Sequence, residues 1–372
     1  MVRVTLLHDW LTGMRGGEKC LEAAARRWPH ARLYTLLHKR GSVSPAIEAL
    51  RPRTSFLDAI PGAHKHYRYL LPLMPAAVAS LDLPESDLML SFSHCVVKAA
   101  RPGASMHVSY CFTPMRYVWH MRSAYFSGRM HGIKAWMIDR VLDALRDWDR
   151  RTAQRVHHFI AISRTVQQRI HECYGRDSVV IYPPVDTDFY TPSPVVQKRE
   201  PFYLIVSAFA PYKRLDLALE TCRRLGRRLV VIGAGQDEAR LKAQTGDTIT
   251  FLGWQSDEVI RDHLRRCQAL LFPGEEDFGI VPVEANACGT PVIAFGRGGA
   301  TETVRDRITG RLFAEQTEDS LADAIEAFER EAYDPHACRR QALQFAQGRY
   351  EAGLFGYIDA LMRPPVPLRQ AA

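Results

Sequence analysis

The chain has 372 residues, of which 47% are hydrophobic and 24% charged, the composition of an ordinary globular protein of about two domains. Its eight cysteines are scattered without a C-x-x-C pair, which argues against a zinc site or a disulfide scaffold and fits a reducing cytoplasm. No apolar run approaches the roughly 18 residues of a membrane-spanning helix and no charged leader precedes the first strand, so we expect neither a transmembrane segment nor a signal peptide.

Positive charge is concentrated in the first half of the sequence. Residues 1–183 contain 26 Lys and Arg against 14 Asp and Glu, and residues 184–372 contain 23 against 27, so balances of +12 and −4 make up the formal net charge of +8. This asymmetry indicates that one domain meets an anionic surface, lipid or nucleic acid, unless much of the excess is ordinary solvated surface. No nucleic-acid-binding motif is present, which argues against nucleic acid as a partner.

The first half of the chain reads as a series of apolar strands, each followed by a loop or a helical segment. The predicted strands are Val2–His8, Leu33–Leu37, Leu88–Phe92, Met106–Cys111, His158–Ile162 and Val179–Tyr182. Repeated strand-to-helix steps predict a parallel sheet with helices on both faces. The pair Gly16 and Gly17 after the first strand is a turn that can bring backbone close to a phosphate or a sugar.

The longest helical pattern covers residues 133–155. Its apolar residues recur at spacings of three and four: Ile133, Trp136, Met137, Val141, Leu142, Leu145 and Trp148. A stripe of this kind predicts that one face of the helix packs on the domain while the arginine-rich face stays outside.

The second half repeats the alternation of strands and helices after a break marked by two prolines, Pro183 and Pro184, which stiffen the chain as expected at a hinge. The predicted strands are Phe202–Ser207, Arg228–Gly233, Thr248–Leu252, Ala269–Phe272 and Pro291–Phe295, and a helical tail covers Leu343–Met362. The chain is therefore predicted to form two domains, residues 1–183 and residues 184–344.

The stretch from Leu271 to Glu302 carries the strongest functional signal. A strand is followed by an acidic loop, a helix with Gly279 and Pro282 at its start, and a second strand that ends in glycines. Ligands of parallel sheets bind beyond the carboxyl ends of the strands, where the N–H groups of a helix N-terminus can face an anion. Two carboxylates separated by seven residues, Glu276 and Glu284, can hold different hydroxyls of one polyhydroxyl ligand.

This E-x7-E pattern, with FP before it and CGTPVIAF and GG-x-x-E after it, resembles the signature of retaining family 4 glycosyltransferases. Further blocks (HDWLTGMRGGEK, YCFTPMRYVWH, LRDWDRRTAQRVHHFIAIS, YPPVDTDF and PYKRLDLAL) resemble bacterial GDP-mannose-dependent mannosyltransferases of surface-polysaccharide assembly. The resemblance implies an α/β fold of GT-B architecture, in which two Rossmann-like domains face each other across a cleft. It also implies that residues 345–372 pack back on the first domain.

The resemblance also assigns roles to individual residues. The implied catalytic residues are Glu276 at the donor sugar, Lys213 at the leaving diphosphate, and His94. The implied donor-binding residues are Gly16, Gly17, Lys213, Arg214, Glu276, Asp277, Phe278, Gly279, Ile280 and Glu284, of which Glu284 would bind the ribose. The implied acceptor-binding residues are Thr113, Arg116 and Tyr117. No metal or other cofactor is expected, because D-x-D is absent and Lys213 with a helix N-terminus can stabilise the charge that grows on the diphosphate.

Two positions depart from the family pattern. Ala208 stands where an arginine is usual, five residues before Lys213, and the neighbouring Arg214 is a candidate replacement. Phe112 stands where many relatives have a histidine directly before the TPMR block, and His94 or His120 could replace it.

The sequence thus predicts an α-mannosyltransferase that moves mannose from GDP-mannose to a lipid-linked oligosaccharide, at the cytoplasmic face of the cell membrane as a peripheral protein. Aromatic residues among Arg116, Arg122 and Arg129 indicate that the basic first domain docks on the anionic membrane surface. Alternatives are a UDP-sugar donor, a non-catalytic nucleotide-sugar sensor, and a nucleic-acid-binding protein built on the basic half. The sequence leaves the acceptor and the linkage open.

Overall fold

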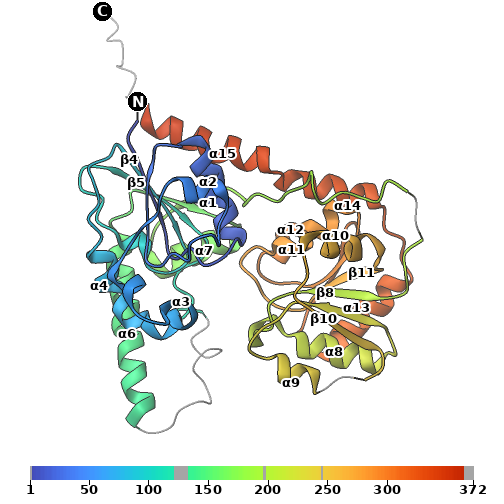
Figure 1. The fold of residues 1–372 in the computed structure, drawn as a ribbon. Coiled ribbons are helices and arrows are strands. Elements are labelled where there is room, and N and C mark those ends of the chain that lie inside the picture. Colours follow the sequence, from blue (N-terminus) through green and yellow to red (C-terminus); the bar gives the residue numbers. More distant parts are fainter. Residues whose placement is uncertain (1, 121–132, 196–197, 244–245, 364–372) are drawn as a thin grey trace, which may run out of the picture.

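The computed structural model describes residues 2–120, 133–195, 198–243 and 246–363. They form two α/β halves, each built on a parallel sheet covered by helices, with a long helix running from one half to the other (Figure 1). The predicted fold class, two Rossmann-like domains of GT-B type, is therefore confirmed.

The first sheet has seven parallel strands in the order β3-β2-β1-β4-β5-β6-β7. The strands are β1 (Val4–His8), β2 (Arg32–Thr35), β3 (Arg53–Thr54), β4 (Leu88–Ser93), β5 (Met106–Cys111), β6 (His158–Ala161) and β7 (Ser178–Val180). All five residues of β1 are buried, because helices cover both faces of the sheet. The sequence pattern does not predict β3, since both of its residues are exposed and carry no apolar signal.

The second sheet has six parallel strands in the order β10-β9-β8-β11-β12-β13. The strands are β8 (Tyr203–Val206), β9 (Leu229–Ile232), β10 (Ile249–Gly253), β11 (Ala269–Phe272), β12 (Val292–Phe295) and β13 (Gly310–Phe313). In each sheet the strand order reverses beside the first strand, where β1 lies between β2 and β4, and β8 between β9 and β11. Such a reversal opens a crevice at the carboxyl ends of the strands, which is the usual place for a ligand.

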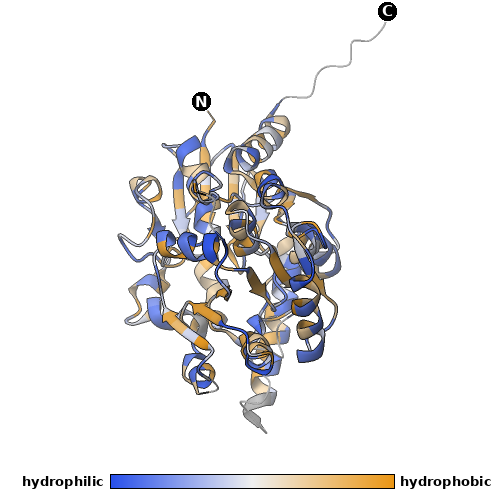
Figure 2. Ribbon diagram, turned by 90° about the vertical axis from the view of Figure 1, so that its right-hand side faces the viewer, coloured by the Kyte–Doolittle hydropathy of each residue, from blue (hydrophilic) through white to orange (hydrophobic). Residues whose placement is uncertain are grey.

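Helices fill the connections between the strands. In the first half they are α1 (Gly16–Arg27), α2 (Pro45–Ala49), α3 (Ala63–His66), α4 (Met74–Ala79), α6 (Ile133–Ala153) and α7 (Arg164–Tyr174). In the second half they are α8 (Leu215–Arg224), α9 (Glu238–Lys242), α10 (Asp257–Arg266), α11 (Ile280–Ala287), α12 (Ala300–Thr303), α13 (Glu318–Glu329) and α14 (Pro335–Ala342). Helix α15 (Gln347–Met362) comes last. Hydrophobic residues gather on the strands and polar residues on the outer helices (Figure 2).

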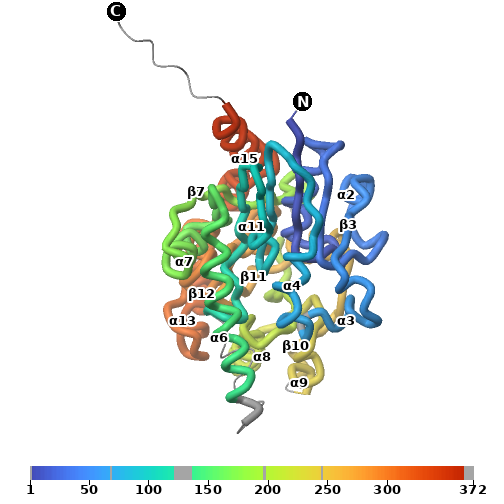
Figure 3. Tube along the Cα trace, turned by 90° about the vertical axis from the view of Figure 1, so that its left-hand side faces the viewer, coloured from blue at the N-terminus to red at the C-terminus, as the bar shows by residue number. Residues whose placement is uncertain are grey.

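Helix α6 differs from its prediction. Leu142 and Leu145 are buried as expected, but Trp136, Met137 and Val141 are 63%, 56% and 42% exposed. The reason is visible in Figure 3, where the first turns of α6 extend beyond the body of the domain, so only its second half has a surface to pack against. The apolar stripe therefore continues past the domain core.

The chain crosses between the two halves twice, and the crossings lie side by side. The N–H of Val185 donates to the carbonyl of Phe345 at 3.0 Å, and Val185 pairs with Ala346 in an isolated bridge. Helix α15 then lies against the first half, where the Tyr350 hydroxyl donates to the carbonyl of Cys20 at 3.1 Å. The predicted boundaries at residues 183/184 and 344/345 stay predictions. None of the described helices is long and apolar enough to cross a membrane.

Candidate active site

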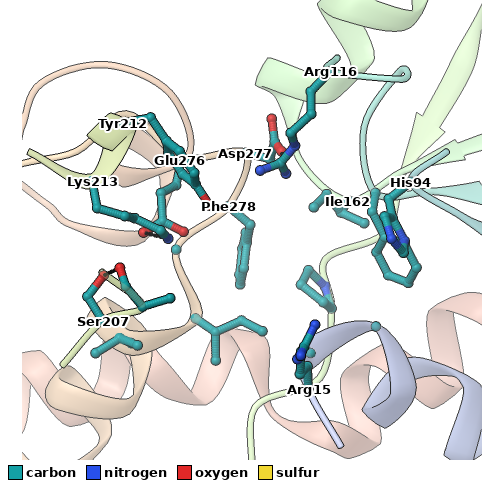
Figure 4. A pocket seen from close by; sticks show the side chains of 18 of the residues that line it. Arg15, His94, Arg116, Ile162, Ser207, Tyr212, Lys213, Glu276, Asp277 and Phe278 are labelled. Carbon is teal, nitrogen blue, oxygen red and sulfur yellow. Dashed lines mark hydrogen bonds and ion pairs between the residues drawn. The ribbon is translucent and has the colours of Figure 1, made fainter. Parts of the chain in front are cut away.

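A cavity of about 430 Å³ lies between the two halves, at the carboxyl ends of both sheets. The first half contributes Arg15, Gly16, Gly17, His94, Arg116 and Tyr117 among others, and the second half contributes Ala208, Lys213, Glu276, Asp277, Phe278, Gly279 and Ile280. Figure 4 shows the two sets of side chains facing one another. Most of the residues that the sequence assigns to donor and acceptor binding are thus brought together in one place.

The second-half wall of the cavity is the turn that leads from β11 into α11. Gly279 precedes the helix with a φ of +86°, a conformation that favours glycine, and α11 has no side-chain cap. Its first N–H groups therefore have no partner within the helix and can serve an anionic ligand. A Cβ on Gly299 would overlap the backbone of Phe278, which explains why a glycine pair follows β12.

Lys213 and Glu276 form an ion pair inside this wall, with side chains only 13% and 21% exposed. Burial alone would lower the pKa of Lys213, but the adjacent Glu276 carboxylate raises the pKa above its usual value. The lysine is consequently a fixed cation. Figure 4 shows both groups at the cavity, where a ligand could form an ion pair with Lys213 or donate a hydrogen bond to Glu276.

Asp277 links the two halves. Its carboxylate accepts hydrogen bonds from Arg116 at 2.6 Å and from Arg169, and Thr113 Oγ1 lies 3.4 Å from it. Arg169 also binds the Glu275 carboxylate at 2.8 Å. Thr113 and Arg116, which the resemblance assigns to the acceptor, thus contact the protein's own acidic loop.

Glu302 makes a second link of the same kind. It accepts hydrogen bonds from the backbone N–H groups of Arg164 and Thr165, at 2.8 and 3.2 Å, and from the Tyr182 hydroxyl at 3.1 Å. These N–H groups begin α7, so the carboxylate caps a helix of the other half. Glu302 is the last residue of the GG-x-x-E flank, and its structural role could not be assigned from the motif alone.

His94 lies on the first-half wall and is held by Asp9. The buried Asp9 carboxylate accepts four backbone N–H bonds of 2.7–2.9 Å, from His94, Cys95, Val96 and Val97, and also lies 3.4 Å from His94 Nδ1. Burial lowers the pKa of His94, and Asp9 opposes this only in part. The turn therefore presents His94 to the cavity as a neutral, oriented ring.

A buried ion pair supports this turn from behind. Lys98 and Asp149 are fully buried, with Nζ 2.6 Å from the carboxylate, and Lys98 also donates to the carbonyl of Cys95 at 2.6 Å. Trp119 Nε1 and the Tyr174 hydroxyl donate to Asp149 at 2.9 and 2.7 Å. These bonds tie the His94 turn to α6 and α7.

Two replacements suggested by the sequence do not reach the cavity. Arg214 does not line it, because its guanidinium is directed to Asp216, with Nε 3.4 Å from the carboxylate, so it does not replace the charge missing at Ala208. His120 lies 3.4 Å from the Cys173 thiol, away from the cavity lining, so it does not replace the histidine missing at Phe112. Arg122 and Arg129 lie outside the described residues.

Glu284 is also absent from the cavity lining, although it belongs to the same helix. It is buried, and no hydrogen bond or ion pair to its carboxylate is found within the described ranges. Burial raises its pKa to about 7, against a smaller opposing effect of Lys19. Its role at a ribose stays a prediction.

No three His, Cys, Asp or Glu residues of the described chain gather in a way that could hold a metal ion. The expectation of metal-independent chemistry therefore depends on experiment. The cavity does hold a further cation that the sequence patterns did not single out, Arg15, directly before the glycine pair.

Comparison with known proteins relates the chain to glycosyltransferases. Residues 186–345 match a family model described as glycosyl transferases group 1. D-inositol 3-phosphate glycosyltransferase of Mycobacteroides abscessus is 34% identical over 166 residues, 39% of this chain and 38% of that protein. The protein of the same name from Stackebrandtia nassauensis is 31% identical over 231 residues, 52% of each chain. The chain thus spans about half or less of the length of these curated relatives.

Solved structures share the fold over nearly the whole chain. Anabaena Alr3699/HepE in complex with UDP aligns with a TM-score of 0.69 and 18% identity, covering 96% of this chain and 100% of that one. Sucrose-phosphate synthase from Thermosynechococcus elongatus aligns with a TM-score of 0.72 and 16% identity, covering 96% and 99%. The resemblance to glycosyltransferases read from the sequence is supported, whereas the narrower one to mannosyltransferases stays a prediction.

Proposed function

We propose that this protein is a retaining glycosyltransferase, which transfers mannose from GDP-mannose to a lipid-linked oligosaccharide. The observation that carries the proposal is the Lys213–Glu276 pair beside the uncapped N-terminus of α11, in a cavity lined by both halves of the chain. A cation, a carboxylate and free N–H groups are what a negatively charged diphosphate joined to a sugar requires.

The chemistry follows from these groups. When the bond between sugar and diphosphate breaks, negative charge grows on the leaving diphosphate, and Lys213 with the α11 N–H groups stabilises it. Glu276 then loses its partner to the diphosphate and accepts hydrogen bonds from the sugar, close to the carbon that reacts. The acceptor approaches from the first half, its hydroxyl oxygen forms the new bond to the same carbon, and its proton passes to the leaving diphosphate.

A UDP-sugar is the second candidate donor, and one observation favours it. The neighbour Alr3699/HepE was solved with UDP and with UDP and glucose. The sensor hypothesis receives less support, because Lys213 and Glu276 stand together in the cavity. The nucleic-acid hypothesis has no site residues of its own.

A panel of nucleotides tests the donor. We expect GDP and GDP-mannose at 100 times their Kd to stabilise the protein by about 2.7 kcal/mol, because they bind only the native state, and to raise Tm accordingly. UDP and UDP-glucose serve as the matched pair. Release of GDP from GDP-mannose should continue in EDTA. Stabilisation by the uridine pair alone would contradict the choice of base, and loss of turnover in EDTA would contradict the metal-independent mechanism.

The proposed lipid-linked acceptor needs a contact with the membrane, and the exposed face of α6 is suited to it. Trp136, Met137 and Val141 form an apolar face next to Arg140 on the half with the +12 charge balance. Aromatic and apolar side chains insert into the interface of a bilayer, while basic residues are attracted to anionic lipid.

Changing Trp136 and Met137 together to serine is therefore expected to lower binding to anionic phospholipid vesicles at least tenfold, since burial of each side chain contributes roughly 1.5–3 kcal/mol. Vesicle sedimentation at low and high salt measures this. Trp254, which is 79% exposed on the second half, provides the control as Trp254→Ser. Equal loss of binding in both variants, or equal binding to neutral vesicles, would argue against α6 as the docking surface.

A further inference from the structure

His8, the last residue of β1, has a ring nitrogen without a partner. The side chain is 1% exposed, and its ring lines the cavity. Nδ1 lies 2.9 Å from the carbonyl oxygen of Trp10, whereas Nε2 is buried and has no hydrogen-bond partner among the described residues. Because a buried polar atom without a partner is unfavourable, a ligand is the natural source of the missing bond.

The charge state of His8 determines what that ligand can offer. A carbonyl only accepts, so Nδ1 must carry the proton that is donated to Trp10, and in the neutral ring Nε2 is then an acceptor. Burial lowers the pKa of His8, while Glu18 and Asp9 oppose this and His94 adds to it. The ring is therefore neutral, and Nε2 needs a donor.

The surroundings of Nε2 show which part of a ligand it would meet. A Cβ on Gly17 would lie 3.3 Å from Nε2 and 3.3 Å from the ring of Phe112, so the absence of a side chain on Gly17 leaves room beside Nε2. The adjacent Gly16 packs so closely on Ile280, the first residue of α11, that a Cβ there would overlap its side chain. His8 thus lies across the cavity from the N-terminus of α11.

We propose that His8 Nε2 accepts a hydrogen bond from a hydroxyl of the donor sugar and thereby selects the sugar. The proposal rests on the proposed function, in which the α11 N-terminus holds the diphosphate. Phosphate oxygens are ionised and have no hydrogen to donate, so Nε2 cannot serve them. The hydroxyls of the donor sugar and of the ribose are the donors next to the diphosphate, and the ribose hydroxyls are assigned above to Glu284.

Two substitutions separate the nitrogen atoms of His8. In His8→Asn the amide N–H₂ can still donate to the carbonyl of Trp10, but no atom stands at the place of Nε2. In His8→Gln the longer side chain can place its carbonyl oxygen there as an acceptor. Calorimetry gives the Kd of GDP and of GDP-mannose for the wild type and both variants. The ratio of the two constants isolates the contribution of the sugar.

We expect the ratio of the Kd of GDP to the Kd of GDP-mannose to fall about tenfold in His8→Asn and to be largely retained in His8→Gln. The Kd of GDP itself should be unchanged in both variants. Deoxy analogues of GDP-mannose identify the hydroxyl, because one of them should bind the wild type more weakly than GDP-mannose does and bind His8→Asn equally well. If the asparagine variant does not fold, His8→Phe keeps the ring shape without its nitrogens and carries the same expectation.

An unchanged ratio of the two Kd values in His8→Asn would overturn the role of His8 while leaving the proposed function intact. So would a glutamine variant as impaired as the asparagine variant, since a structural role requires no acceptor at this place. If the wild type binds the UDP pair instead, the same ratio is taken with UDP and UDP-glucose. Failure of the wild type to bind either pair would overturn the proposed function and the role of His8 together.

Discussion

Replacing Lys213 by methionine is expected to lower kcat on the order of 100- to 1,000-fold, the usual effect of removing one group that stabilises charge in the transition state. Methionine keeps the length of the side chain and removes the cation, so the leaving diphosphate loses its partner. The expectation depends on the position of Lys213 in the cavity, paired with Glu276. Steady-state release of the nucleoside diphosphate from the donor measures it.

The two members of the pair should differ in binding. Lys213→Met should also weaken binding of the free nucleoside diphosphate, whereas Glu276→Ala should lower turnover by orders of magnitude and leave that binding nearly intact, because the carboxylate serves the sugar. Lys198→Met, at an exposed lysine of the same half, is the control and should behave as the wild type. Normal turnover by Lys213→Met would contradict the mechanism. If the residual activity depends on a metal ion, that ion and not Lys213 would be assigned the stabilisation of the leaving diphosphate.

Glu284→Gln is expected to weaken nucleotide binding roughly 10- to 100-fold. The reason is that a carboxylate that accepts the two ribose hydroxyls makes charge-assisted hydrogen bonds of about 1.5–3 kcal/mol each, which an amide reproduces only in part. The raised pKa of about 7 adds a dependence on pH. Binding favours the ionised form, so wild-type affinity should increase as pH rises from 6 to 8.

Stability of the ligand-free protein should change in the opposite sense. The folded pKa of Glu284 lies above its ordinary value of 4.5, so this residue's contribution to stability is full below about pH 4.5 and is lost as pH rises through 7. At pH 8 Glu284→Gln should therefore be more stable than the wild type by roughly 1–3 kcal/mol. Chemical denaturation and titration of nucleotide at several pH values test both trends. Unchanged affinity would contradict the ribose role.

Much of the fold was accessible from the sequence because it is encoded in local patterns. Parallel strands buried on both faces are continuous apolar runs, so Met106–Cys111 and Ala269–Phe272 agree with β5 and β11 to the residue. The helix after Gly279 was equally clear from its start signals. Short or polar elements such as β3 have no such pattern and were not predicted.

The contacts that organise the site were less accessible. Asp277 and Arg169 are 108 residues apart, and Lys98 and Asp149 are 51 apart, so nothing local indicates that they meet. Periodicity likewise did not reveal that Trp136 is exposed, because an apolar stripe does not show where the partner surface ends. His8 reads as the last residue of an apolar strand, and only the fold shows that it lines the cavity and that its Nε2 is buried without a partner among the described residues.

The paired crossings of the chain have a mechanical consequence for the cavity. Val185 and Ala346 are bridged, so the two segments that connect the halves form one hinge and not two independent linkers. A rotation of one half about this hinge would widen the cavity far from the crossings more than close to them. The hydrogen bonds from Arg116 to Asp277 and from the Arg164 N–H to Glu302 join the two halves and would oppose this rotation. Because a rotation about one line has a single variable, the distance between one pair of spectroscopic labels, one on each half, would be enough to follow it.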